Sequence, residues 1–323
     1  MSKIKVGVVR CDTHAVYYAN LIQEHDPHVL RELRGNGYFY FYTCYSDSRK
    51  MAFSKVPGFE ITKLWDEDGK TAENMARIYY DAPKVCNTLE EVSDGVDLVL
   101  IADCNGDGLD HLKLAAPGIK KGVPTFIDKP FAYEVKDARR MVELAEKHKT
   151  PIMSLSILRA LPQVARFRNR FAELNGPEFG VIKGSGGAMA AHVHSISLAQ
   201  HLFGKGVESV EAMGQTPLAY VHLDYGGKPK RPKAGVVLAC DSGGSPHCAM
   251  YASAYSRLGA IHSAAFDDWI FPDGVIEILK MIKNMVRTGK PQADYEEMTE
   301  CIAIATAARL AQKERRRVYL REV

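Results

Sequence analysis

The sequence lacks any Cys-x-x-Cys pair, and its seven cysteines are odd in number. Both facts argue against a disulfide framework or a structural zinc site and are typical of a reducing compartment. Long hydrophobic runs are also missing. The longest, near 96–102 and 301–308, fall well short of the roughly 20 residues of a membrane span. The segment before Arg10 holds too few apolar side chains for a signal peptide. We therefore expect a cytoplasmic protein without a membrane partner.

A large excess of either charge is absent as well. Lys and Arg number 42 against 39 Asp and Glu, which leaves a formal net charge of +3. The basic clusters 228–233 and 314–317 contain no interleaved aromatic residues, so we expect no nucleic-acid partner. A composition of 46% hydrophobic and 25% charged residues is that of a globular protein, and 323 residues suggest about two domains.

Short apolar runs alternate with helical patterns in the first half of the chain. Strands are expected at 4–9, 59–65, 96–102, 123–127 and 151–154. Between them, Ala72, Met75, Ala76 and Tyr79 recur at the spacing of one helix face, and 109–121 and 138–145 carry helical patterns too. This alternation predicts a Rossmann-type, doubly wound parallel sheet in residues 1–153. An insertion near 30–58 contains the aromatic run 38–42, either an added strand or a lid.

The second half, residues 154–323, changes character. Helical patterns at 161–174 and 193–203 are followed by β-type runs at 207–213, 219–225, 235–240, 248–255 and 260–266. Because no helices separate these runs, an α+β domain with a mostly antiparallel open sheet is predicted. Two amphipathic helices close the chain, near 275–282 and 298–305, and Gly289 is expected to cap the first of them.

The turn after the first predicted strand departs from the glycine-rich loop that cradles a dinucleotide diphosphate. The three glycine positions of G-x-G-x-x-G are occupied by Arg10, Asp12 and Ala15, of which only alanine is an accepted substitute. A carboxylate at Asp12 opposes a diphosphate, and Arg10 is expected to compensate. With Thr13 at the helix start, these residues are candidate cofactor ligands. The alternative is that the loop binds no dinucleotide.

Asp66 ends the second predicted strand, where a carboxylate can accept both ribose hydroxyls of an adenosine. This favours NAD as the cofactor, although Lys70 and Arg49 are near enough in sequence to leave NADP open. The alternative role of Asp66 is to cap the helix that starts near Lys70.

Four further residues are candidates for chemistry or for substrate binding. Lys129, before Pro130, is placed at the carboxyl edge of the parallel sheet, where ligands bind. His194 lies near a helix start and suits acid–base catalysis. His192 is a weaker substrate candidate, and two histidines at this spacing point apart on a helix, so we predict no metal site. Arg159 meets either a substrate anion or, more simply, a salt-bridge partner.

Together these motifs resemble the Gfo/Idh/MocA family of glucose–fructose oxidoreductase and inositol dehydrogenase relatives. The matching features are Leu64-Trp65-Asp66, the 101–105 loop with Asn105 followed by His111, Asp128-Lys129-Pro130, His194 with 202–204, and 287–291. The resemblance covers nearly the whole chain apart from the insertion at about 30–58.

The resemblance implies NAD(P)-linked hydride transfer at a hydroxyl-bearing carbon of a sugar or polyol. Lys129 would orient the reacting hydroxyl and His194 would act in proton transfer, while Asn105 and His111 would lie at the cofactor. It also implies a homodimer or homotetramer that packs through the open face of the second sheet.

Two departures from the family pattern concern activity. The aspartate expected four residues before His194 is Ala190, and the one expected three residues after it is Ser197. Together with the missing glycines, they leave two alternatives to an oxidoreductase open. One is a ligand-binding or regulatory relative, and the other is a lyase or hydrolase that uses the nicotinamide only transiently.

Overall fold

The structure is a computed structural model in which two compact units are distinguished. It describes residues 2–33, 53–103, 106–184, 189–214, 220–239 and 249–323. Unit 1 comprises 1–131, 139–154 and 275–294, and unit 2 comprises 132–138, 155–274 and 295–323. The break after Ser154 lies next to the predicted boundary. Residues 275–294, which we had placed in the second domain, make their contacts within unit 1.

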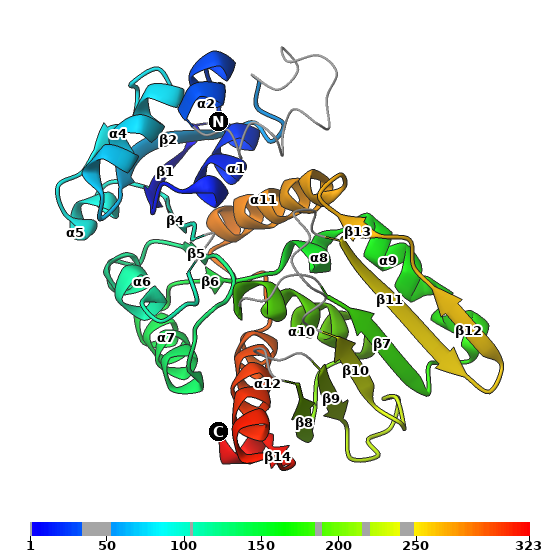
Figure 1. Ribbon diagram of the computed structural model, residues 1–323. Coiled ribbons are helices and arrows are strands. Elements are labelled where there is room, and N and C mark those ends of the chain that lie inside the picture. The colour runs from blue at the N-terminus through cyan, green and yellow to red at the C-terminus, as the bar shows by residue number, and fades with distance from the viewer. Residues whose placement is uncertain (1, 34–52, 104–105, 185–188, 215–219, 240–248) are drawn as a thin grey trace. The chain divides into compact units, whose positions relative to one another are not determined.

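Unit 1 is built on a six-stranded parallel sheet (Figure 1). Its strands are β1 (Ile4–Val9), β2 (Phe59–Trp65), β3 (Lys84–Val85), β4 (Leu98–Ile101), β5 (Thr125–Ile127) and β6 (Ile152–Met153). The order β3-β2-β1-β4-β5-β6 is that of the Rossmann fold, so the predicted fold class is confirmed. All side chains of β4 are buried, as expected for a parallel strand covered on both faces.

The predicted helices near 72–79, 109–121 and 138–145 are present in unit 1, which also contains helices that the sequence did not predict there. The helices of this unit are α1 (Thr13–Ile22), α2 (Pro27–Leu33), α4 (Gly69–Ile78), α5 (Leu89–Val92), α6 (His111–Lys120), most of α7 (Val135–His148) and most of α11 (Phe271–Thr288). The predicted apolar face of α4, from Ala72 to Tyr79, is buried. Gly289 ends α11 with a φ of +65° and donates its N–H to Met285, which confirms it as the cap.

Unit 2 contains an eight-stranded sheet in which β7 and β10 are the parallel pair and the other neighbours are antiparallel. Its strands are β7 (Phe179–Lys183), β8 (Ser209–Met213), β9 (Tyr220–Asp224), β10 (Val236–Ala239), β11 (Ala249–Ser256), β12 (Gly259–His262), β13 (Phe266–Asp267) and β14 (Val318–Tyr319). The mostly antiparallel sheet is thus confirmed. The predicted run 260–266 is two short strands rather than one.

Helices cover one face of this sheet. α10 (Met189–Phe203) packs on β7 and β10, and α12 (Tyr295–Glu314) packs on β8 (Figure 1). The remaining helices are α8 (Ile157–Ala160), α9 (Pro162–Asn169) and the 3-10 turns Arg170–Leu174 and Leu320–Glu322. The alternating burial along β9 and β11 shows which face meets the helices. The opposite face exposes Met213, Tyr220 and Tyr251.

Three predicted features fall outside the described residues: the aromatic run 38–42, Arg49 and the loop residue Asn105. Within the described part of the chain, no helix combines the length and the apolar character needed to cross a membrane.

Candidate cofactor and active site

The turn between β1 and α1 holds the first group of predicted cofactor residues. Arg10 has a φ of +67°, a left-handed conformation that glycine adopts at little cost. The carboxylate of Asp12 caps α1, accepting the backbone N–H of His14 at 2.8 Å and that of Ala15 at 3.3 Å. In a glycine-rich cradle such N–H groups face a diphosphate. Here the Asp12 carboxylate accepts both N–H groups instead, and Thr13, the next residue, begins the helix.

Arg10 is the centre of an ion-pair network. Its guanidinium lies 3.1 Å from Glu67 and 3.8 Å from Asp103, and it directly contacts Asp110. Burial opposes the positive charge, but Asp110, Asp103 and Glu67 outweigh it and raise the pKa of Arg10. The Nε atom is buried and has no hydrogen-bond partner within the described residues. The guanidinium thus bridges the segments after β2 and β4, with one donor unused.

Asp66 lies directly after β2, as predicted. Its Oδ2 accepts the backbone N–H of Cys11 at 2.8 Å, and its Oδ1 accepts that of Asp68 at 2.9 Å. The helix cap is Asp68, whose side chain accepts from Lys70 N–H, so the capping role suggested for Asp66 is wrong. A carboxylate has about four lone-pair sites, so Asp66 can still accept ribose hydroxyls while it holds the β1–α1 turn.

Asp103 and His111 form a buried pair after β4. His111 begins α6 with no exposed surface, and its Nε2 lies 3.4 Å from Asp103 Oδ2. Burial raises the pKa of Asp103, but His111 and Arg10 more than compensate, and this pKa lies below its ordinary value. Ligand atoms of Asp103, Asp110 and His111 all lie within 4.8 Å of one another. That spacing suits a cation, and Arg10 supplies positive charge to both carboxylates.

Lys129 and Asp128 follow β5 at the carboxyl edge of the same sheet. Both are buried, so Lys129 is not a solvated loop residue. The Lys129 backbone N–H donates to Asp128 Oδ1 at 2.8 Å. The other carboxylate oxygen, Oδ2, contacts Nδ1 of His14 from the first turn of α1.

The remaining candidates belong to unit 2. His194 Nδ1 lies 2.7 Å from the Ser156 hydroxyl. Arg159 contacts Glu297 and donates to Gln200 at 3.1 Å, which confirms the salt-bridge alternative for this residue. His192 is fully buried in α10, a position that favours a core role over substrate binding.

The structure brings five predicted residues to one edge of the unit 1 sheet: Arg10, Asp12, Asp66, His111 and Lys129. Sequence reasoning assigned no site role to their partners Glu67, Asp103, Asp110, His14 and Asp128. A usable signal existed for several of these, because acids directly after two parallel strands meet at a shared edge.

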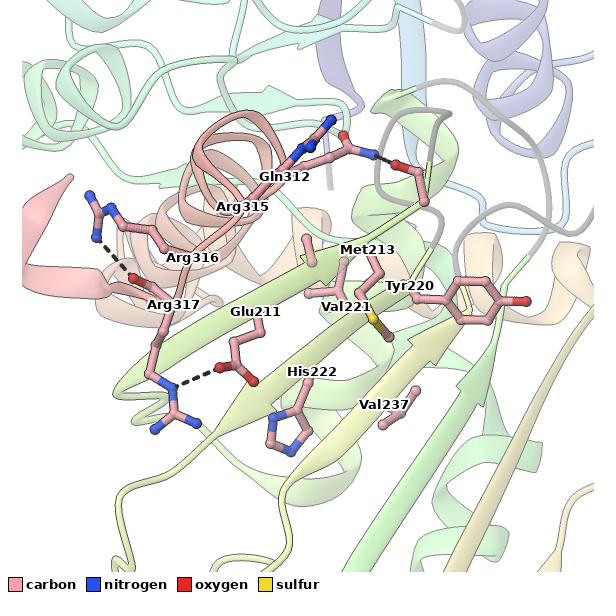
Figure 2. A pocket seen from close by; sticks show the side chains of 12 residues that line it. Glu211, Met213, Tyr220, Val221, His222, Val237, Gln312, Arg315, Arg316 and Arg317 are labelled. Atoms are coloured by element: carbon pink, nitrogen blue, oxygen red, sulfur yellow. Dashed lines mark hydrogen bonds and ion pairs between the residues drawn. The ribbon is translucent and has the colours of Figure 1, made fainter.

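A separate pocket of about 510 Å³ lies on the face of the unit 2 sheet that carries Met213 and Tyr220 (Figure 2). Met213 and Tyr220 line it from paired positions of β8 and β9. Arg317 reaches Glu211 at 3.2 Å, and Gln312 donates to the Gly214 carbonyl at 2.8 Å. This arginine is thus neutralised by an acid of the same sheet.

Comparison with known families matches residues 41–155 to the Gfo/Idh/MocA oxidoreductase family, described by its NAD-binding Rossmann fold. The matched region contains β2 to β6 and the Lys129 loop, but it begins after β1 and the Arg10 turn. No curated protein matches the chain.

Solved structures resemble the chain over nearly its full length. The apo scyllo-inositol dehydrogenase from Lactobacillus casei is 11% identical, with a TM-score of 0.75 and 99% of each chain covered. A myo-inositol dehydrogenase from Corynebacterium glutamicum is 14% identical, with a TM-score of 0.71, 98% of this chain and 99% of that chain. An Agrobacterium radiobacter oxidoreductase, solved with NAD+, L-tartaric acid and magnesium, is 14% identical, with a TM-score of 0.70 and 99% of each chain. At such identities the likeness establishes the two-part fold.

Proposed function

Residues 41–155 belong to the Gfo/Idh/MocA oxidoreductase family, and we propose that the whole chain is an NAD(P)-linked oxidoreductase acting on a hydroxyl of a sugar, polyol or related small molecule. The observation that carries the proposal is the buried Lys129 at the carboxyl edge of a Rossmann sheet. This edge of a doubly wound sheet is where such folds bind ligands, so the lysine lies where a substrate hydroxyl would be held.

The residues of the first turn would bind a dinucleotide through side-chain charge rather than through a glycine-rich backbone. The unused Arg10 Nε donor and its guanidinium charge supply the cation that a diphosphate needs. Asp66 supplies the ribose acceptor. Because Glu67 adds a second carboxylate beside it, a ribose phosphate would be repelled, which favours NAD over NADP.

A bound nicotinamide would supply the hydride acceptor. The protein's own task is to hold the substrate hydroxyl and to take its proton. Lys129 would orient the hydroxyl, since an ammonium or amine at a sheet edge can donate to or accept from an oxygen. His194, paired with Ser156, is the second candidate for proton transfer.

One observation favours a second candidate function. Asp12 takes the N–H groups of His14 and Ala15 that would otherwise face a diphosphate. A non-redox relative that binds a small ligand without a dinucleotide would have this capped turn. A lyase or hydrolase with transient redox chemistry would instead keep the cofactor and show no net reduction of it.

For the assembly, we propose a homodimer or homotetramer joined through the uncovered face of the unit 2 sheet. Met213, Tyr220 and Tyr251 are exposed on that face, and apolar side chains gathered on one sheet face are typical of a covered surface. Sedimentation of the wild-type protein and of Tyr220→Glu tests this, since a buried charge would shift the assembly toward monomer.

Calorimetric titration with NAD and with NADP tests the main proposal, followed by a turnover screen over polyols and sugars that begins with myo-inositol. We expect NAD to bind more tightly than NADP. Lys129→Met should lower kcat/KM at least 100-fold, while the exposed Lys136→Met serves as the matched control. Binding of neither cofactor would favour the ligand-binding relative, and product formed without net cofactor reduction would identify the transient-redox enzyme.

A further inference from the structure

His14 and Asp128 form a carboxylate–imidazole pair that joins two distant parts of unit 1. His14 Nδ1 contacts Asp128 Oδ2. The Asp128 side chain is 2% exposed, whereas the His14 side chain is 19% exposed. A buried carboxylate that holds a partly exposed imidazole is the arrangement by which proteins orient a histidine for proton transfer.

Lys129 shares the same carboxylate. Its backbone N–H donates to Asp128 Oδ1, so one carboxylate connects the histidine to the lysine loop. Although burial raises the pKa of Asp128, the charges of His14 and Lys129 outweigh it, and this pKa lies below its ordinary value. Two further titratable groups lie next to the pair: the Tyr18 phenol, whose pKa is raised by burial and by Asp128, and Asp12, which accepts the His14 backbone N–H.

Oxidation of an alcohol removes a hydride from carbon and a proton from oxygen. The hydride passes with its electron pair to the nicotinamide, and the proton needs a route from the base at the hydroxyl to water. In unit 2 the acid expected four residues before His194 is Ala190. In unit 1 the carboxylate that orients the partly exposed His14 also accepts the backbone N–H of Lys129, so it holds the histidine and the lysine loop at one sheet edge.

We propose that His14, oriented by Asp128, is a proton relay behind Lys129: the neutral Lys129 amine takes the proton of the substrate hydroxyl, the neutral His14 imidazole accepts that proton from the Lys129 ammonium, and His14 releases it to water. His14 acts through Lys129 and is therefore a positioning residue rather than a group that touches the reacting atoms. The proposal rests on the proposed oxidoreductase function, and its tests separate the two.

The first test needs no turnover. Deuterium exchange at the His14 ring carbon, followed by mass spectrometry from pH 4 to 9, reports when this imidazole is protonated. Because His14 lowers the pKa of Asp128, reciprocity requires that Asp128 favours the protonated His14. In Asp128→Asn the midpoint for His14 should move to lower pH. An unchanged midpoint would overturn the relay whatever the enzyme catalyses.

The second test uses the substrate found in the screen. His14→Gln should lower kcat about 10- to 100-fold at neutral pH, leave KM within about threefold, and remove one ionisation from the pH profile of kcat. Imidazole in the buffer should partly restore His14→Ala, because a small base can enter the vacated site. His28→Gln, an exposed histidine of α2, is the matched control, and thermal melting checks that each variant folds.

The outcomes differ for the two proposals. Turnover with an unchanged pH profile in His14→Gln and no rescue by imidazole overturns the relay alone. Absence of wild-type turnover with either cofactor overturns the oxidoreductase proposal and the relay with it. A changed profile together with rescue supports both.

Discussion

Arg10→Gly separates two explanations of the unusual first turn, because they predict opposite changes in NAD affinity. If the turn needs space for the diphosphate, glycine restores part of the cradle and binding becomes tighter. If the turn instead supplies charge, as proposed here, removal of the guanidinium weakens binding. Arg10 combines a left-handed backbone, which glycine would also adopt, with an ion-paired guanidinium. The variant therefore tests whether NAD binding depends on the space at this position or on the charge.

The effect on stability should be small because two terms oppose each other. Glycine at a φ of +67° relieves roughly 1–2 kcal/mol of backbone strain. The lost ion pairs are worth a similar amount: Glu67 and Asp110 are 49% and 37% exposed, and such pairs contribute about 1 kcal/mol or less each. Asp103, the third partner, would still accept the backbone N–H of Gly106 at 2.9 Å. We therefore expect a net change within about 1 kcal/mol.

The effect on cofactor binding should be larger. A hydrogen bond between charged groups contributes about 1.5–3 kcal/mol, which corresponds to roughly 10- to 150-fold in Kd. Calorimetric titration of NAD into wild type, Arg10→Gly and Arg10→Lys measures this. Lysine keeps the charge but loses the planar fork, so its Kd should lie between the other two.

Two results would refute this reasoning. Tighter NAD binding in Arg10→Gly would show that the guanidinium obstructs the site. An unchanged Kd would show that Arg10 does not meet the cofactor. Arg77→Gln, which removes a positive charge from the exposed face of α4, controls for the change in net charge.

Three further predictions concern stability. His25 is buried, which lowers its pKa to about 4. The protein should therefore be fully stable with respect to this group above pH 6.5 and should lose about 3 kcal/mol of unfolding free energy as the pH falls to 4, because the unfolded chain binds the proton more tightly. Denaturant titration across that range should show a smaller loss of stability in His25→Leu. Arg159→Ala should destabilise the protein by roughly 1–3 kcal/mol, because Glu297 loses its ion-pair partner. KM should stay unchanged, and a raised KM would instead support a role of Arg159 in substrate binding. Gly180→Ala should cost about 1–3 kcal/mol in urea unfolding, since a Cβ would lie 2.5 Å from the Phe203 ring.

Five of the six strands of the unit 1 sheet were predictable because they are apolar runs separated by helical patterns. The sixth, β3, was missed because it has only two residues, Lys84 and Val85. The central strand of the second sheet, β7, was missed. It contains Gly180 and buries only alternate side chains, so its pattern is weaker than the fully buried apolar run of β4. Its place in the sheet depends on pairing with β10 and β11, and such long-range pairing is not visible in a local window.

The individual site residues were predictable but their partners were not. Lys129 and Asp66 follow strands, so their place at the sheet edge follows from topology. The contact between His14 and Asp128 joins residues 114 positions apart, and nothing in the local sequence sets that pairing. At α4 the sequence offers three consecutive acids at 66–68 as possible caps, and only the geometry selects Asp68.

The two departures in the first turn depend on each other, which explains why they occur together. Asp12 places a carboxylate where an anionic ligand would bind, and this change alone would repel a diphosphate. Arg10 places a cation in the same turn, and its acidic partners Glu67 and Asp110 lie partly exposed, so they can return to water when the guanidinium turns to a new anion. A strained arginine is costly unless it serves a ligand. The pair therefore fits the proposal that this turn exchanges one anionic partner for another, with the diphosphate of the proposed cofactor as the incoming anion.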